Sequence, residues 1–394
     1  MRALGELARI QAGYAFESAR FTNSPTDVPL VKGENVQQGY VDWSIAKRWP
    51  ETEMDALEQF LLKPGDIVVA MDRPWVEAGL KWAYIRPEDP PSLLVQRVAR
   101  LRAGSALDQT YLRALISSSY FSTYIQPIVT GVNVPHISSK QIAGFKVPVP
   151  PMEQQKKIAA LISAYDDLID NNQRRVALLE SMAEEIYREW FVRTRCPVDT
   201  EANRSPERLQ SFDSLCQLQR GFDLPDSDMH PGAVPVIAST SVKGFHNVAK
   251  VKPPVITTGR SGSLGTVLYV REPAWPLNTS LWVKDFKGNS PNLVYFTLRG
   301  LHLENFNAGA GVPTLNRNHL KSIKVRVPTA DSQAKFDELV EPILAQAQGL
   351  RLACAKFAST RDALLPRLIS GKLRVDALDI QFPPSMQQPT QMPA

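Results

Sequence analysis

The sequence predicts an α+β protein with a pseudo-twofold internal repeat, in which two mixed, β-rich domains are separated by two long antiparallel, coiled-coil-like helices. Three observations support this prediction. Segments of the first half recur in the second half, each half contains several short strand-like runs, and each half ends in a long stretch with helical periodicity. A chain of 394 residues has room for two or three domains.

Two ungapped alignments define the repeat. Residues 4–14 align with residues 212–222 at an offset of 208, and residues 131–155 align with residues 309–333 at an offset of 178. The first half therefore carries about 30 more residues between the two anchors, and matching ends with unlike interiors suggest one fold used on two different targets. The identical pairs of the second alignment are Gly131/Gly309, Val134/Val312, Pro135/Pro313, Lys146/Lys324, Val147/Val325, Val149/Val327, Pro150/Pro328 and Gln155/Gln333.

The strand-like runs are short, rich in β-branched or aromatic residues, and bounded by Gly, Pro, Asn or Asp. Shorter helices are expected near residues 107–124 and 291–303. The runs lie at residues 66–71, 81–85 and 146–149 of the first half, and at residues 234–238, 255–258, 266–270, 280–283 and 323–327 of the second half.

The long helices are predicted from apolar residues that recur every three or four positions. No Gly or Pro occurs between Glu153 and Arg193, and about 41 helical residues would span roughly 60 Å. Such a helix needs a partner for its apolar stripe, and residues 336–369 carry a similar stripe. Pro342 is expected to kink or break this second helix, and Gly371 to end it. The alternative arrangement is two separate helical bundles.

These patterns divide the chain into six segments. We predict a first domain over residues 1–150, a central helix over 151–193, a linker over 194–208, a second domain over 209–328, a C-terminal helix over 329–374 and a disordered tail over 375–394.

The composition excludes several classes of protein. No run of 18 apolar residues is present, so no membrane span is expected, and the N-terminal residues lack a signal-peptide core, so we expect a cytoplasmic protein. Cys196, Cys216 and Cys354 are widely spaced and predict neither a disulfide framework nor a metal site.

No catalytic motif is found. The sequence has no phosphate-binding loop and no Asn/Asp-Pro-Pro-Tyr/Phe motif of adenine methyltransferases. The glycine-rich stretch Gly259–Gly265 lies between two strand-like runs and is predicted to be a β-turn loop, while Asp166, Asp167 and Asp170 are predicted to form a solvated helix face. We therefore expect no catalytic residue, metal or cofactor in this chain.

Basic charge is concentrated in the second domain. Residues 204–328 hold 15 Lys and Arg against 8 Asp and Glu, whereas residues 1–150 hold 16 against 15. Excess positive charge suits contact with phosphates, and Arg, Lys, Asn and Ser in loops can reach base edges. The candidate DNA-binding residues are Lys32, Asn35, Arg73, Lys81, Asn133 and Lys140 in the first domain, and Arg220, Ser239, Lys243, Arg260, Ser261, Asn316, Arg317 and Lys321 in the second.

Two pairs of loops occupy matching places. The loops at Lys32 and Ser239 follow the similar runs VPLV and VPVI, and Arg73 and Arg260 follow the runs DIVVAM and VITT. This predicts a shared reading face in the two domains. At the end of the central helix, Tyr187, Trp190 and Phe191 form an aromatic cluster, which we expect to dock on a partner or on the adjacent domain.

The central stretch from Pro150, PPMEQQKKIAALISAYDDLIDNNQRRVALLESMAEEIYREWF, resembles the characteristic helical region of the specificity (HsdS) subunits of type I restriction-modification systems. The stretch LLPRLISGKLRV, from Leu364, resembles the same family. The resemblance covers about residues 1–375. The second junction, VRVPTADSQAKF, departs from the family pattern because it lacks the Pro-Pro and the first Glu-Gln.

The resemblance implies that each β-rich domain is a target-recognition domain that reads one half of a bipartite site in double-stranded DNA. It implies that the helices set the spacing between the half-sites and dock two methyltransferase subunits, through which two restriction-translocation subunits join. The cofactors for methylation and cleavage would belong to those other subunits. Two alternatives remain: a helical adaptor that does not read DNA, and an enzyme with an unrecognised site.

Overall fold

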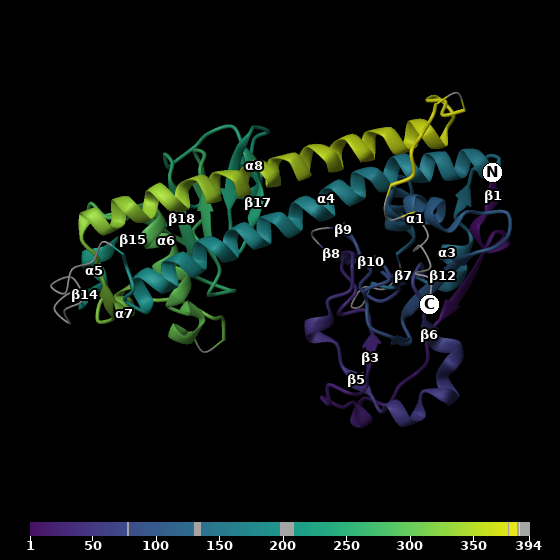
Figure 1. Cartoon of the computed structure of the whole chain (residues 1–394), viewed down its shortest axis with the longest axis horizontal. Coiled ribbons are helices and arrows are strands. Elements are labelled where there is room, and N and C mark those ends of the chain that lie inside the picture. Colours follow the sequence, from purple (N-terminus) through teal and green to yellow (C-terminus); the bar gives the residue numbers. More distant parts are fainter. Residues whose placement is uncertain are drawn as a thin grey trace. The chain divides into compact units, whose positions relative to one another are not determined.

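The computed structural model describes residues 1–76, 79–129, 135–197, 209–309, 311–376, 378–383 and 386. It contains two compact units, Met1–Asn172 with Leu352–Ala394, and Gln173–Arg351 (Figure 1). Each unit combines small mixed sheets with a part of helix α4 (Met152–Tyr187) and a part of helix α8 (Ala330–Ile369). The predicted α+β class with two β-rich regions and two long helices is confirmed.

The first unit has a five-stranded and a four-stranded sheet. The five-stranded sheet has the order β2 (Ala8–Ala12), β12 (Val98–Ala103), β7 (Ile67–Ala70), β10 (Trp82–Tyr84), β4 (Gln38–Gly39), and the four-stranded sheet the order β5 (Arg48–Trp49), β3 (Val28–Val31), β11 (Ser92–Leu94), β6 (Leu61–Leu62). Two short pairs accompany them, β1 (Arg2–Ala3) with β13 (Lys146–Val147), and β8 (Trp75–Val76) with β9 (Gly79–Leu80). The helices of this β-rich region are α1 (Gln109–Ser117), α2 (Ser119–Ile125) and α3 (Ser139–Ala143).

The second unit is built in the same order. Its four-stranded sheet runs β15 (Gln217–Arg220), β21 (Ser280–Asp285), β18 (Val255–Gly259), β19 (Val267–Val270), and its three-stranded sheet runs β17 (Val242–His246), β16 (Val234–Ile237), β20 (Trp275–Pro276). Strand β14 (Leu209–Ser211) pairs with β22 (Lys324–Arg326), and the helices are α5 (Phe212–Leu215), α6 (Pro291–Gly300) and α7 (Arg317–Leu320).

The two units correspond strand by strand, which confirms the internal repeat. The order β2-β12-β7-β10 matches β15-β21-β18-β19, and the parallel pair β3–β11 matches the parallel pair β16–β20. Most of the extra residues of the first unit lie between β3 and β7, in the stretch that contains β4, β5 and β6, and of these β5 pairs with β3 as β17 pairs with β16. The insertion therefore enlarges the periphery of the sheets and leaves the shared strands in place.

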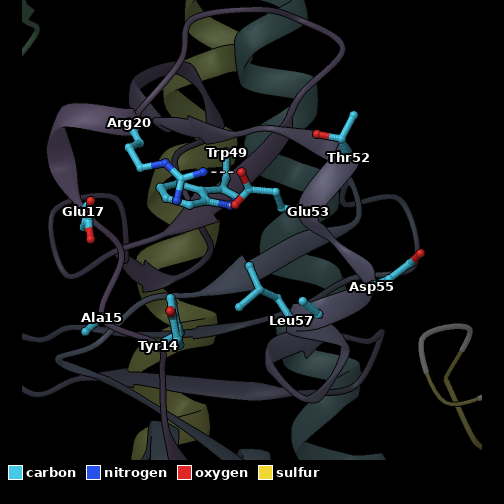
Figure 2. Close-up of a pocket in the computed structure, with 10 residues that line it drawn as sticks. Tyr14, Ala15, Glu17, Arg20, Trp49, Thr52, Glu53, Asp55 and Leu57 are labelled. Atoms are coloured by element: carbon cyan, nitrogen blue, oxygen red, sulfur yellow. Dashed lines mark hydrogen bonds and ion pairs between the residues drawn. The ribbon is translucent and has the colours of Figure 1, made fainter.

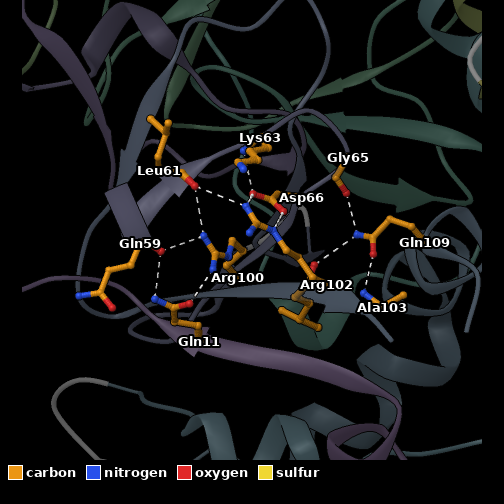
Figure 3. A network of polar contacts seen from close by, with 11 residues as sticks. Gln11, Gln59, Leu61, Lys63, Gly65, Asp66, Arg100, Arg102, Ala103 and Gln109 are labelled. Atoms are coloured by element: carbon orange, nitrogen blue, oxygen red, sulfur yellow. Dashed lines mark hydrogen bonds and ion pairs between the residues drawn. The ribbon is translucent and has the colours of Figure 1, made fainter. Parts of the chain in front are cut away.

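A buried arginine ties this insertion to the main sheet. Arg100 on β12 is only 3% exposed, and its guanidinium donates to the Gln59 oxygen at 3.2 Å, the Leu61 oxygen at 3.1 Å and the Gln11 side chain at 2.5 Å (Figure 3). The neighbouring Arg102 pairs with Asp66. Because a buried charge is stable only when its donors are satisfied, these carbonyls fix the path of the inserted segment.

The repeated glutamines Gln155 and Gln333 have the same structural task. Each lies in the first turn of a long helix, where its side-chain oxygen accepts from the backbone N–H of the capping residue of a shorter helix, Asp108 at 2.8 Å or Ser290 at 2.7 Å. Each amide also donates to the carbonyl of the preceding proline, Pro150 or Pro328. Both glutamines are buried, so they lock each long helix to its own β-rich region.

The stretches of α4 and α8 within each unit lie antiparallel. In the first unit Asp166 pairs with Arg361 at 2.7 Å and Ile169 lies beside Cys354. In the second unit Glu180 pairs with Arg351, and Tyr187 packs against Phe336 with ring centroids 6.3 Å apart. The expected antiparallel pairing is confirmed within each unit.

Two expectations about helix ends had different outcomes. Gly371 follows α8 with a φ of +73° and its N–H bonds to Leu368, as expected for a C-terminal glycine. The expected break at Pro342 is wrong, because α8 continues through it from Ala330 to Ile369. Packing of Val340 and Leu344 in the core of the second unit accompanies this continuation. Helix α4 ends in a π-helical turn, Arg188–Val192.

The aromatic cluster belongs to the core of the second unit. Tyr187 is 9% and Phe191 5% exposed, and both pack against Phe336, as does the half-buried Trp190. The hydroxyl of Tyr187 bonds to Thr297 at 3.2 Å. The structure therefore supports docking of this cluster on the adjacent domain. Tyr187 and Phe191 are too buried to contact a partner.

The structure also differs from the expected linker and tail. Cys196 is buried in the core of the second unit, while residues 198–208 lie outside the described residues. Val375 is buried in the core of the first unit, and Ile380 and Met386 pack against it. The described part of the tail is therefore held by apolar contacts, which its Pro- and Gln-rich composition does not predict.

An ion pair on α8 gives a pH-dependent prediction. Arg271 and Asn292 donate to Glu341 at 3.0 and 3.1 Å, and the hydrogen bond from Arg271 is the main cause that lowers the pKa of the Glu341 carboxyl. A lowered folded-state pKa stabilises the protein above the unfolded value of about 4.3, and this stabilisation is lost as the pH falls through the folded value. We expect Glu341→Gln to lower Tm at pH 7 and to differ less from the wild type at pH 3. An equal difference in Tm at both pH values would contradict this assignment.

Candidate nucleic-acid interface

Three segments of the first unit meet in what we call the first loop cluster, residues 32–35, 71–74 and 135–138. The Lys81 ammonium donates to the Gly33 carbonyl. The Arg73 N–H donates to the Pro135 oxygen at 2.7 Å, and the Ile137 N–H donates to the Met71 oxygen at 2.8 Å. Backbone hydrogen bonds therefore join residues 71–74 to residues 135–138, and the side chain of Lys81, whose own N–H bonds to the Pro74 oxygen, joins residues 32–35 to them.

The second unit has a second loop cluster, residues 238–241, 259–262, 277–279 and 313–316. The Ser239 hydroxyl donates to the Ser261 oxygen at 2.7 Å and to the Thr279 oxygen at 3.0 Å. The Gly262 N–H donates to the Pro313 oxygen at 2.9 Å, and the Leu315 N–H donates to the Arg260 oxygen at 2.8 Å. The same type of loop junction is thus built twice.

These backbone bonds fix which residues are equivalent in the two clusters. Pro135 corresponds to Pro313 in the sequence repeat, and their partners Arg73 and Gly262 are therefore structural equivalents. By the same pairing, Arg260 corresponds to Met71. The expectation that Arg73 and Arg260 hold matching positions is thus corrected: the two arginines are displaced by two residues along the loop.

Candidates in the first unit differ in what their side chains can reach. Lys32 pairs with Glu34 at 2.8 Å and lies over the Phe21 ring, while Arg73 and Lys140 are exposed. Asn133 lies outside the described residues.

Two of these candidates have internal roles instead. Asn35 is 1% exposed, and its amide bonds to the Lys32 N–H at 2.8 Å and the Leu30 oxygen at 3.0 Å. Lys81 is 8% exposed, and burial lowers the pKa of its ammonium. Both residues shape the loops and are withdrawn as base-reading candidates, because sequence position alone does not show which side chains turn inward.

Several candidates in the second unit are held by neighbouring groups. Arg220 pairs with Asp223 at 3.3 Å and Lys243 with Asp226 at 2.5 Å. The Arg260 guanidinium donates to the Asn278 oxygen at 3.2 Å, and that of Arg317 to the Leu218 oxygen at 3.2 Å. These contacts orient the side chains without burying Arg220, Lys243 or Arg317.

The remaining candidates of the second unit flank the cluster. Asn316 caps α7 through the Asn318 N–H at 3.0 Å, and Lys321 is exposed directly after this helix. Ser239 uses its hydroxyl to join loops, and Ser261 contributes backbone groups to the same junction. Ser239 is therefore a positioning residue of the cluster.

Sequence analysis missed a charged group in the first cluster. The Asp72 carboxylate accepts from His136 at 2.6 Å and from Arg97 at 3.4 Å. Arg97 has a left-handed φ of +70°. These three residues are distant in the sequence, so no motif spacing reveals them. The sequence signal is the alignment of His136 with Thr314 in the repeat. In the structure, each of these residues forms a β-bridge to the loop after the equivalent strand, β7 or β18.

Comparison with known proteins shows which family the chain resembles. Residues 1–181 match the family model of the type I restriction modification DNA specificity domain. The specificity subunit of the type I restriction enzyme MjaVIII of Methanocaldococcus jannaschii is 29% identical over 184 residues, which are 46% of this chain and 43% of that protein. The EcoAI specificity subunit of Escherichia coli is 34% identical over 167 residues, which are 42% of this chain and 27% of that protein.

Through residues 1–181, the chain is similar to the HsdS family of specificity subunits. The fold is similar to that of the S subunit of a type I restriction-modification system from M. genitalium, with a TM-score of 0.54 at 17% identity over 93% of this chain and 95% of that one. The matched regions span less than half the length of the first two curated relatives. The match to MjaIX of M. jannaschii is longer, at 23% identity over 68% of this chain and 70% of that protein.

The chain also has a cavity of about 400 Å³ in its first unit, beside the insertion (Figure 2). Arg20 lies over the Trp49 ring at 4.6 Å and pairs with Glu53, which also accepts from the Trp49 indole at 3.2 Å. Glu17 and Asp55 add two further carboxylates to the lining. Because Arg20 is already paired, the excess negative charge disfavours phosphate binding, and we place the cavity outside the interface.

The described residues of the chain contain no group of three or more His, Cys, Asp or Glu suited to hold a metal ion. Among the same residues, no helix is long and apolar enough to cross a membrane.

Proposed function

We propose that this chain is the DNA sequence-specificity subunit of a type I restriction-modification complex, and that each β-rich region reads one half of a bipartite site. The observation that carries this proposal is the repeated loop cluster, built on equivalent strands in both units. We assign the two target-recognition domains to residues 1–150 and 209–328. The match of residues 1–181 to the family model of the DNA specificity domain supports the assignment of the first domain.

Differences between the clusters support two different half-sites. Equivalent loop positions hold Arg73 in one unit and Gly262 in the other, and Met71 in one and Arg260 in the other. Direct readout depends on which donors and acceptors face the base edges, so unlike side chains on the same backbone select unlike bases. The excess of basic residues in the second domain favours phosphate contact there.

We propose that α4 and α8 set the spacing between half-sites and dock the methyltransferase subunits. Each helix contributes residues to both units. Their lengths of 36 and 40 residues correspond to about 54 and 60 Å. On α4, Leu178 is 65% and Met182 54% exposed, one helical turn apart. This apolar pair is the surface that we assign to a methyltransferase subunit, because exposed apolar neighbours on a helix suit a protein interface.

The complete assembly would contain double-stranded DNA, two methyltransferase subunits and two restriction-translocation subunits. Methylation and cleavage would be performed by those subunits, with this chain supplying sequence selection.

The purified chain and its complex with the cognate methyltransferase subunit provide the test. We expect sequence-selective DNA binding by the complex, with an affinity that falls steeply as salt rises, and no methylation by the isolated chain. Stable assembly without selective DNA binding would indicate an adaptor, and stoichiometric S-adenosylmethionine binding by the isolated chain would indicate an enzyme.

A further inference from the structure

Arg73 combines a strained backbone with an exposed cationic side chain. Its φ is +43°, in the left-handed region that non-glycine residues rarely occupy. The equivalent residue of the second unit is Gly262, with a φ of +92°. The loop junction therefore requires a left-handed residue in both units, and glycine would satisfy it without strain.

The side chain of Arg73 provides no internal compensation for this strain. Among the described residues, its guanidinium has no hydrogen bond or ion pair, and the residue is exposed. The adjacent carboxylate of Asp72 is already used by His136 and Arg97. Backbone strain that no contact within the folded protein offsets is typical of a functional site.

The backbone around Arg73 is fixed on both sides. The Arg73 N–H bonds to Pro135 at 2.7 Å, and the preceding Met71 bonds to Ile137 through its oxygen and to Arg97 through its N–H, both at 2.8 Å. A phosphate contact needs only a long cationic side chain. A base contact also needs a backbone that holds the Cα of that side chain in a fixed position. The fixed origin favours base reading.

We propose that Arg73 is a specificity-determining residue that reads a guanine in the half-site of the first unit. The guanidinium presents two parallel donors, which match the O6 and N7 acceptors of guanine in the major groove. The proposal rests on the proposed function of the chain. In the second unit, Gly262 lacks a side chain at the equivalent position, so this contact belongs to the first half-site alone.

Methylation mapping of the modification complex tests the proposal with two variants, Arg73→Gly and Arg73→Lys. Arg73→Gly should relax one position of one half-site from guanine to any base, with discrimination there falling by roughly 5- to 150-fold. Arg73→Lys should lose less discrimination at the same position, because the lysine ammonium can still donate to O6 and N7 but lacks the planar fork of the guanidinium. The other half-site and the spacing should stay unchanged. Arg73→Gly should also melt at or above the wild-type temperature, because it relieves the left-handed strain. A purely structural arginine would give a lower Tm instead.

Lys287→Gly is the matched control, since Lys287 is a basic residue with a φ of +54° that follows β21 at the end remote from the second loop cluster. It should leave both half-sites unchanged. The assignment would be overturned if both Arg73 variants kept full guanine selection, or if methylation fell equally at all sites with the motif intact. Neither result would contradict the proposed function. A wild-type complex that methylates no bipartite motif would overturn both.

Discussion

Gly221→Ala is expected to lower the stability of the second unit by about 3 kcal/mol, which corresponds to a fall in Tm of roughly 6–12 °C for a unit of this size. A Cβ on Gly221 would lie 2.2 Å from the Leu277 oxygen and 2.5 Å from the Pro276 oxygen. These are backbone atoms, and the strand cannot move away, because the Gly221 N–H bonds to Ser280 at 3.0 Å and the Phe222 N–H bonds to Pro276 at 2.8 Å. Thermal unfolding followed by circular dichroism measures the effect.

Gly300→Ala provides the control in the same unit. Gly300 is the last residue of α6, and a Cβ there would meet no atom within 4 Å. Alanine at this position should leave Tm unchanged or raise it slightly. If Gly221→Ala melted like Gly300→Ala, the close approach of the two strands would be wrong. The repeat makes the same prediction for Gly13, where a Cβ would lie 2.4 Å from the Leu94 oxygen.

The double variant Leu178→Asp/Met182→Asp is expected to abolish assembly with the methyltransferase subunit while leaving the fold intact. Both side chains are exposed in the structure, so their replacement removes little of the core. Two charges in an apolar contact should weaken association at least about 30-fold, since a central interface residue contributes about 2 kcal/mol or more. Co-purification and analytical ultracentrifugation measure the loss.

The matched control is Val248→Asp, which places a charge on an apolar residue that is 48% exposed in the β-rich part of the same unit. This variant should still assemble. Normal assembly of the double variant would exclude this face of α4 as the docking surface, and a lowered Tm would show that the pair has a structural role instead.

The architecture could be predicted because it follows from periodicity and repetition. The apolar stripes of α4 and α8 and the matched anchors at Gly13/Gly221 and Gln155/Gln333 are properties of sequence spacing. The structure adds the physical reasons, a close strand contact for the glycines and a helix anchor for the glutamines. Pro342 does not break α8, which is supported by the packing of Val340 and Leu344 in the core of the second unit.

The reading residues were harder to predict because loops close on partners that are distant in the sequence. Asn35 and Lys81 looked like surface groups, yet both turn inward to satisfy backbone carbonyls. Arg73 and Arg260 were aligned by the strands before them, but hydrogen bonds to the Pro135 and Pro313 segments show a shift of two residues. A repeat defines a scaffold well, whereas the direction of each side chain depends on tertiary contacts.

The most direct test of the central claim is to map methylated bases in a genome that expresses this chain with its cognate methyltransferase subunit, and again with residues 209–328 replaced by those of another specificity subunit. We predict a bipartite motif with a fixed unread gap, which is absent without this chain. The replacement should change one half-site and leave the other half-site and the gap as they were. A change in both half-sites, or a motif that does not depend on this chain, would contradict the account.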